Sequence, residues 1–383
     1  MNGDGIGAAN IVVKVFGRAF DARQHFRLTD PAFAGSVSPY RQILSSPDLF
    51  RPTVSGIRCR YSRFCNICFP PLPWHISASD SMLFRISHLT DYHYPAPVAE
   101  AYLELRLTPQ SRRDQIVKQH ALQIEPSVQV SNYEDYFGNQ VSFISLPYRH
   151  LRLKISSEAL VATTAPPLPA ESLELSIQES RQILGSALPF VFDYLQPTEM
   201  VKISRESTQW ARRYLSGRMI LGKGLEDLTR AIWESFEYEK GSTEFSTDLS
   251  VVWKQRRGVC QDFAHVMLSV LRTAGLPSRY VCGYIETAPP PSESGAKRLV
   301  GSIATHAWVE TYIPGQTWVA LDPTNNRWCG EQHIAVSFGR DARDAAPIRG
   351  TFKGGGRQTL KVRVKVKRLR EQPVRRRIEQ HGR

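Results

Sequence analysis

The sequence predicts an α+β protein in which an amino-terminal β-sandwich precedes a mixed α+β domain. Three observations support this fold class. Short strand-like segments recur at close spacing from Leu83. Helical patterns follow a Pro-rich linker, and a further helix leads into a strand hairpin near the carboxyl end. At 383 residues the chain is long enough for two domains.

The strand-like region is placed at residues 82–165. Its segments alternate apolar and polar residues and are separated by turn residues: "LFRISHLTDYHY", "YLELRLTP", "HALQIEPS", "VSFISL" and "LRLKISSEALV". A repeat of about ten residues per strand and turn is typical of a β-sandwich. The Pro-rich stretch "TTAPPLPAES" then reads as a linker.

The second domain is placed at residues 166–340, with leading helices in "ESLELSIQESRQIL", "RESTQWARRYLSG" and "GLEDLTRAIWESFEYE". An apolar stripe at helical spacing marks the last of these: Leu225, Leu228, Ile232, Trp233 and Phe236. Residues 341–367 are expected to form a returning loop and a final strand, because "TLKVRVKVKRL" alternates strictly. Residues 368–383 form a basic tail.

Residues 1–81 show no sustained periodicity. We expect them to be disordered, or to be an extension upstream of a natural start at Met82. The alternative is an appended zinc or docking module, since Cys65 and Cys68 form a C-x₂-C pair near Cys59 and His75. A second cysteine pair at the usual spacing is missing, so no metal site is predicted.

The formal net charge of +13 lies at the two ends of the chain. Residues 351–383 carry +10 and residues 1–81 carry +4, which leaves −1 for residues 82–350. This distribution argues against specific nucleic-acid binding. The sequence contains no apolar run of about 18 residues, so no membrane-spanning helix is predicted. The first residues lack the features of a signal peptide. The cytoplasm is therefore the expected compartment.

The segment "RRGVCQDFAHVMLSVLRTAGLPSRYVCGY" places a cysteine before a helix that ends at Gly275. One helical face is apolar: Phe263, Val266, Met267, Val270, Leu271 and Ala274. Cys260 thus falls at the helix N-terminus, where free N–H groups and the helix dipole favour a thiolate. The same N–H groups could hold an oxyanion. A small apolar filler under the helix is the alternative interpretation.

The segment "THAWVETYIPGQTWVALDPTNN" predicts two strands joined at Pro314-Gly315. An odd number of unpaired residues, such as 314–316, would place His306 and Asp322 on one face, directly opposite or one diagonal apart. A His–carboxylate bond there would fix the imidazole tautomer and support an imidazolium beside a thiolate. A strand histidine capped by a neighbouring aspartate is the alternative.

Together the pieces "RRGVCQDFAH", "LRTAGLPSRYVCGY", "HAWVETYIPGQTWVALDPTNN" and "GRDARDAAPIRGTFKGGGRQTLKVRV" resemble the transglutaminase-like cysteine enzymes, in the bacterial branch described as cysteine proteases. "FRISHLTDYHYPAPVAEAYLELRLTPQ" and "NYEDYFGNQVSFISL" resemble the amino-terminal β-domain of that branch. The resemblance covers residues 82–367. It implies a papain-like/transglutaminase-like α+β catalytic domain and a catalytic triad of Cys260, His306 and Asp322.

The implied activity is acyl transfer at amide bonds of a peptide or protein through a thioester. Hydrolysis by a peptidase or amidase is favoured, because it needs no second binding site and no calcium-ligand pattern is visible. Transamidation and a catalytically silent binding module are the alternatives. No cofactor is predicted, and the sequence leaves the oligomeric state open.

Other residues near the triad have weaker assignments. Gln255 or Trp253 could supply a second oxyanion hydrogen bond. Trp308 could form a wall of the cleft or belong to the core. His265 is expected to be structural, since it lies on another face of the helix from Cys260. Cys282 and Cys329 are expected to be packed or partly exposed thiols.

Overall fold

The computed structural model describes residues 81–286, 299–301, 304–315 and 317–369. The expectations for residues 1–80, including the cysteines there, and for the tail from residue 370 lie outside the described residues. Within the described part of the chain, no helix is long and apolar enough to cross a membrane.

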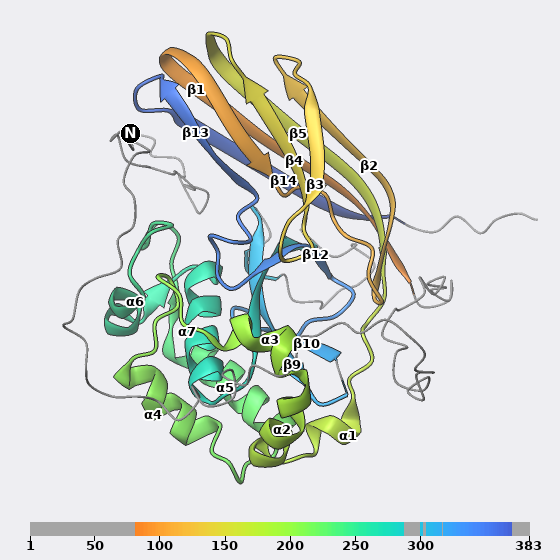
Figure 1. Ribbon diagram of the computed structural model, residues 1–383, viewed down its shortest axis with the longest axis vertical. Helices are drawn as coiled ribbons and strands as arrows, with labels where there is room; N and C mark the ends of the chain where they lie inside the picture. The colour runs from red at the N-terminus through yellow and green to blue at the C-terminus, as the bar shows by residue number, and fades with distance from the viewer. Residues whose placement is uncertain (1–80, 287–298, 302–303, 316, 370–383) are drawn as a thin grey trace, which may run out of the picture. The chain divides into compact units, whose positions relative to one another are not determined.

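The strand-rich region forms one seven-stranded antiparallel sheet organised around the long first strand, β1 (Figure 1). β1 pairs with β5 and β14 along its first half and with β4 and β13 along its second half. The register shifts between His93 and Val98, where two prolines interrupt donation to the ladder. The strands are β1 (Met82–Leu105), β2 (Gln115–Glu125), β3 (Val130–Glu134), β4 (Gln140–Leu146), β5 (His150–Thr163), β13 (Ile348–Gly354) and β14 (Thr359–Leu369).

The carboxyl-terminal strands return to the amino-terminal region. β14 shows the expected alternation, with Val364 and Val366 buried and Lys361, Lys365 and Lys367 exposed. Val364 and Val366 pack in one cluster with Phe84 and Ile86 of β1. A strand almost 280 residues later in the sequence therefore completes the core beside the first strand.

The second region places helices against a five-stranded sheet of order β11-β10-β9-β8-β12. The strands of this sheet are β8 (Ser278–Ile285), β9 (His306–Ile313), β10 (Thr317–Asp322), β11 (Arg327–Trp328) and β12 (His333–Gly339). Two short strands, β6 (Glu237–Tyr238) and β7 (Arg257–Gly258), pair in parallel elsewhere. The α-helices are α1 (Ala170–Leu173), α2 (Ile177–Leu184), α3 (Leu188–Val191), α4 (Arg205–Tyr214), α5 (Leu221–Ser235), α6 (Leu249–Gln255) and α7 (Cys260–Thr273).

α7 is the central helix, in contact with α4, α5, α6, β8 and β9. Every residue from Asp262 to Arg272 is buried, so the expectation of a single apolar face was too narrow. The polar side chains of this helix find partners inside the protein. His265 accepts a hydrogen bond from the Ala342 amide at 3.1 Å, and Arg272 donates to backbone carbonyls, among them that of Ser278 at 3.0 Å. His265 is thus structural, as expected.

The apolar stripe predicted for α5 is correct except at one position. Leu225, Leu228, Ile232 and Phe236 are buried, whereas Trp233 is 52% exposed. Trp233 directly follows Ile232, and neighbouring helical positions point about 100° apart. Inclusion of Trp233 in the buried stripe was therefore wrong.

Two primary amides from the strand-rich region bond to the backbone of β12, the last strand in its sheet. Asn139 donates to the Phe338 carbonyl and accepts from the Phe338 amide, both at 2.7 Å. Gln115 makes the same pair of bonds with Ala335, both at 2.9 Å. Each side chain thus replaces a neighbouring peptide group and satisfies backbone groups that an edge strand leaves unpaired.

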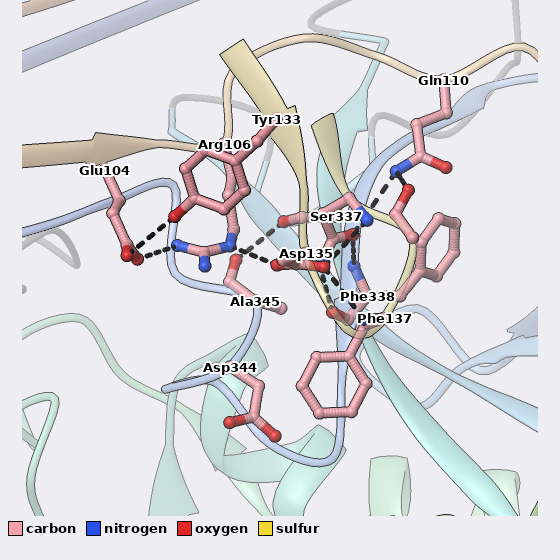
Figure 2. A network of polar contacts seen from close by, with 12 residues as sticks. Glu104, Arg106, Gln110, Tyr133, Asp135, Phe137, Ser337, Phe338, Asp344 and Ala345 are labelled. Atoms are coloured by element: carbon pink, nitrogen blue, oxygen red, sulfur yellow. Dashed lines mark hydrogen bonds and ion pairs between the residues drawn. The ribbon is translucent and has the colours of Figure 1, made fainter. Parts of the chain in front are cut away.

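A charged network holds the loop that carries Asn139 (Figure 2). Arg106 donates to Asp135 at 2.9 Å and to Glu104 at 3.0 Å. Asp135 also accepts from the Phe137 amide at 3.0 Å and from the Asn139 side chain at 3.0 Å. The "YEDYFGNQ" stretch, held by these hydrogen bonds, therefore connects the strand-rich region to β12 through Asn139.

Candidate active site

Cys260 is the first residue of α7, as the sequence predicted, and its side chain is buried. Asp262 fixes the turn before the helix by accepting from the Val259 amide at 2.8 Å and from the Thr243 hydroxyl at 2.6 Å. A Cβ at Gly258 would lie 2.7 Å from an Asp262 carboxylate oxygen, so glycine is required there. This turn delivers the sulfur to the positive end of the helix dipole.

His306 begins β9 and Asp322 ends β10, and their side chains meet. The pairing of Val309 with Leu321 places Asp322 one diagonal from His306, which confirms that both lie on one face. His306 Nε2 lies 2.8 Å from Asp322 Oδ2, with both residues almost fully buried. Asp322 Oδ1 accepts a hydrogen bond from the Thr324 amide at 3.0 Å, so the turn that follows β10 fixes the orientation of the carboxylate.

The pair of His306 and Asp322 carries opposite charges. Burial alone would lower the pKa of His306, but the charge and hydrogen bond of Asp322, with a smaller effect of Cys260, raise that pKa to about 10. Burial would raise the pKa of Asp322, but His306 and the nearby His333 lower it below its usual range. An imidazolium–carboxylate pair is therefore the favoured state at neutral pH.

The second ring nitrogen of His306 is the one available to the thiol. Nδ1 is buried and makes no hydrogen bond of regular geometry with the described residues, although Cys260 is close enough to raise the pKa of His306. The backbone of Gly301 lies against this nitrogen, since a Cβ there would approach Nδ1 to 2.5 Å. A loose Cys–His contact is common before substrate binds. The expected hydrogen-bond distance between Cys260 and His306 stays a prediction.

Three residues that sequence reasoning missed belong to this site. Asn325 donates to Asp322 Oδ2 at 2.7 Å, and His333 Nε2 lies 3.2 Å from the same oxygen. Tyr238 lies close to Cys260 and Asp322. Burial raises its pKa most, and the charges of these two residues raise it further. The Asn that directly follows the "DPT" turn was a usable signal, because asparagine there can bond back to the strand end. Nothing in the local pattern marks His333 or Tyr238.

Of the three residues predicted to assist the triad, only Trp308 contacts a triad residue in the described part of the chain. Trp308 is 1% exposed, and its ring packs against that of His306 with centroids 6.2 Å apart. Trp253 is buried in an aromatic cluster with Trp210 and Phe236. Gln255 is exposed at the end of α6. Among the described residues, no hydrogen bond or ring contact joins Trp253 or Gln255 to the triad residues, so their role as oxyanion donors stays a prediction.

The remaining described cysteines are buried free thiols. Burial, followed by the charge of Cys260, raises the pKa of Cys282 to about 12. Burial likewise raises the pKa of Cys329 well above its usual range. Both thiols are protonated at neutral pH and serve as internal references for the reactivity of Cys260.

Two family models match the chain. The model of the bacterial transglutaminase-like N-terminal region matches residues 84–162, and the model of the transglutaminase-like superfamily matches residues 208–323. The second match contains Cys260, His306 and Asp322. The two matches thus correspond to the strand-rich region and to the helices and sheet that hold the site.

Curated relatives and a solved structure agree with these matches. The chain is 35% identical over 278 residues to the uncharacterized protein Rv2569c of Mycobacterium tuberculosis, covering 70% of this chain and 86% of that protein. It is 33% identical to the uncharacterized protein ML0607 of Mycobacterium leprae, covering 74% and 98%. A Cytophaga hutchinsonii protein, provisionally assigned as a cysteine protease, superposes with a TM-score of 0.58 at 20% identity, covering 77% and 93%. That structural likeness supports the fold.

Proposed function

Because this chain belongs to the transglutaminase-like superfamily, we propose that it is a cysteine enzyme that cleaves or transfers acyl groups at amide bonds of a peptide or protein. Cys260 is the nucleophile, His306 the general base and acid, and Asp322 the residue that orients the imidazole. One observation carries the proposal. A buried imidazole bound to a carboxylate at 2.8 Å lies beside a cysteine at a helix N-terminus.

The chemistry follows from the charges of these three groups. The Cys260 thiolate attacks the carbonyl carbon, a C–S bond forms, and the carbonyl electron pair moves to oxygen. The N–H groups at the start of α7 stabilise this oxyanion. The intermediate collapses to a thioester as the C–N bond breaks, and the amine leaves with a proton from His306. Water, deprotonated by His306, then attacks the thioester and releases the acid and the free thiol.

Hydrolysis is the favoured outcome, because the second step needs only water. Transamidation is the second candidate, in which a primary amine replaces water. It is favoured by a 69-residue stretch that is 44% identical to the protein-glutamine gamma-glutamyltransferase of Pseudomonas aeruginosa. That stretch covers 18% of this chain and 10% of that protein, so we rank hydrolysis first.

Acyl-enzyme trapping with p-nitrophenyl acetate tests the nucleophile. We expect a burst of p-nitrophenolate and one acetyl group on the protein, assigned to Cys260 by peptide mapping because the chain has six cysteines. Cys260→Ala should abolish the burst. Cys329→Ala is the matched control and should retain it, since that thiol is buried and protonated. Acetylation of the wild type elsewhere, or a burst that survives in Cys260→Ala, would refute the proposal and indicate another nucleophile, whereas the absence of any burst would refute it and favour the silent binding module.

A partition experiment separates the two candidate outcomes. The acetyl-enzyme is challenged with increasing concentrations of putrescine, and acetate and N-acetylputrescine are both quantified. Acetate should remain the main product if the enzyme is a hydrolase. Saturable formation of the amide at the expense of acetate would instead indicate a binding site for an amine and thus transamidation.

A further inference from the structure

We propose that His333 is a positioning residue that donates a second imidazole N–H to Asp322, holds the carboxylate in place and weakens its hold on the His306 proton. The inference rests on the proposed function, since it assigns a role in the same site. It concerns a residue of β12, on the far side of β8 from the strand that carries His306.

The hydrogen bonds of His333 define its tautomer. The Gly330 amide lies 3.3 Å from His333 Nδ1, and because an amide N–H only donates, Nδ1 must be the acceptor. The proton of a neutral ring then sits on Nε2, which lies 3.2 Å from Asp322 Oδ2. His333 is thus arranged to donate to the same oxygen that receives His306 Nε2 at 2.8 Å.

The surroundings keep His333 neutral. Burial has the largest effect and lowers its pKa, the hydrogen bond and the charge of Asp322 raise it, and the charges of His306 and Arg327 lower it, so that the pKa lies below its usual value. His333 also lines a solvent-connected hollow with Cys329, Glu310, Arg112 and Asp114. In that hollow Arg112 pairs with both Glu310 and Asp114 at 2.7 Å, and Arg279 also donates to Glu310, at 2.9 Å, so two cations compensate two carboxylates. The Trp308 ring packs edge-on against His333 at 5.3 Å between centroids.

The shared oxygen explains the effect on His306. Asp322 Oδ2 receives donors from His306, His333 and, at 2.7 Å, Asn325. Each additional donor stabilises the negative charge on the carboxylate and lowers its attraction for the proton of His306. A carboxylate bound to His306 alone would hold the imidazolium more tightly. His333 and Asn325 therefore ease proton transfer from His306 to the leaving amine while they fix the orientation of the carboxylate.

Two variants of His333 distinguish a side chain that donates a hydrogen bond to Asp322 from one that only fills the space. His333→Leu fills the space without an N–H, whereas His333→Gln offers an amide that can donate to Asp322 and accept from Gly330. Both are made in the full-length chain in a Cys260→Ala background, so that only Asp322 and its donors set the titration of His306. The midpoint of that titration is read from the ring nitrogen shifts in NMR.

We expect His333→Leu to raise the His306 midpoint by about half a pH unit or more, because a hydrogen bond to the charged carboxylate is lost. His333→Gln should leave it close to that of the parent. In the unsubstituted protein, two-bond ¹H–¹⁵N spectra should show His333 neutral with its proton on Nε2. An unchanged midpoint in His333→Leu, equal shifts in both variants, or a charged His333 at neutral pH would overturn the inference.

This test is independent of turnover. The NMR measurements need no substrate, so absence of acetyl transfer to Cys260 refutes the proposed function without affecting them. If His333→Leu does not fold, the tautomer in the unsubstituted protein still decides. As the catalytic counterpart, His333→Leu in an otherwise unsubstituted chain should slow hydrolysis of the acetyl-enzyme about threefold or more, because a midpoint raised by about half a pH unit leaves about a third as much neutral His306 to deprotonate water, and His333→Gln should restore most of the rate.

Discussion

Replacement of Asp322 by asparagine keeps the shape of the side chain but exchanges one oxygen that accepts hydrogen bonds for a nitrogen that donates them. The asparagine Oδ1 can still accept from the Thr324 amide, which lies 3.0 Å from Oδ1 in the wild type. Its Nδ2 takes the place of the oxygen that receives His306 at 2.8 Å, Asn325 at 2.7 Å and His333 at 3.2 Å. The donors of buried His306 and His333 and of half-buried Asn325 would then face another donor.

The hydrogen bonds of Asp322 give the expected loss of stability and of acylation rate in this variant. A hydrogen bond to a charged group contributes about 1.5 to 3 kcal/mol, so loss of the two shortest bonds, partly relieved by ring flips, should reduce the free energy of unfolding by about 3 kcal/mol. Without the carboxylate, burial lowers the pKa of His306 and the ring is neutral at pH 7. Its proton moves to Nδ1, toward Cys260, which is the wrong tautomer for a base. We expect acylation to slow by about 10⁴-fold.

The assays are the p-nitrophenyl acetate burst and chemical denaturation. Asp344→Asn is the control, because Asp344 also accepts a charged hydrogen bond, from Arg340 at 2.7 Å, but makes no hydrogen bond to the triad. A burst rate within tenfold of wild type in Asp322→Asn would refute the role of Asp322. A loss of activity equal to that of Asp344→Asn would show that general destabilisation is the cause.

The pKa shifts of His306 and Asp322 also predict how the stability difference between wild type and Asp322→Asn depends on pH. The pKa of His306 is raised from 6.5 to about 10, so its contribution is complete below about pH 6.5 and disappears as the pH rises through 10. The pKa of Asp322 is lowered from 3.8, so its contribution is present above that value. The difference in unfolding free energy between wild type and Asp322→Asn should therefore be largest from about pH 4 to 6.5 and shrink toward pH 10.

Four further outcomes are expected. His306→Ala and Cys260→Ala should each abolish acetyl turnover, and the double variant should be no worse than either single one, because the two act as a unit; additive losses would contradict this. Gly301→Ala should lower the burst rate at least tenfold, because glycine has φ of +97° there and a Cβ would collide with His306 Nδ1; a wild-type rate would show that the 299–301 segment moves freely. Tyr238→Phe should slow acylation about 10²-fold if the hydroxyl binds the oxyanion, and unchanged kinetics would exclude that role. Asn139→Ala should lower the free energy of unfolding by about 3 kcal/mol, because both backbone groups of Phe338 lose their 2.7 Å partners; a loss below about 1 kcal/mol in denaturant titration would refute this account.

The local geometry of the site was predictable from the sequence, because it depends on short-range periodicity. Helical spacing after Cys260 indicated the start of α7. The two-residue period of strands put His306 and Asp322 on one face for a loop with an odd number of unpaired residues such as 314–316, and the pairing of Ile313 with Thr317 leaves that loop. The alternation in the last strand predicted the inward face of β14, on which Val364 and Val366 are buried and Leu360 and Val362 are half-buried. The family resemblance then named the three residues as one triad, which periodicity alone does not do.

Only the tertiary structure decided which distant residues meet at Asp322. His333 reaches Asp322 because β12 pairs with β8, and the pairing of two strands across the sheet leaves no mark on the spacing within either one. α7 is buried all round because helices and a sheet enclose it, so an apolar pattern on one face underestimated its burial. Side-chain polarity reports the local preference of each residue. The protonation of His306, in contrast, follows from the burial and the charges that folding collects around it.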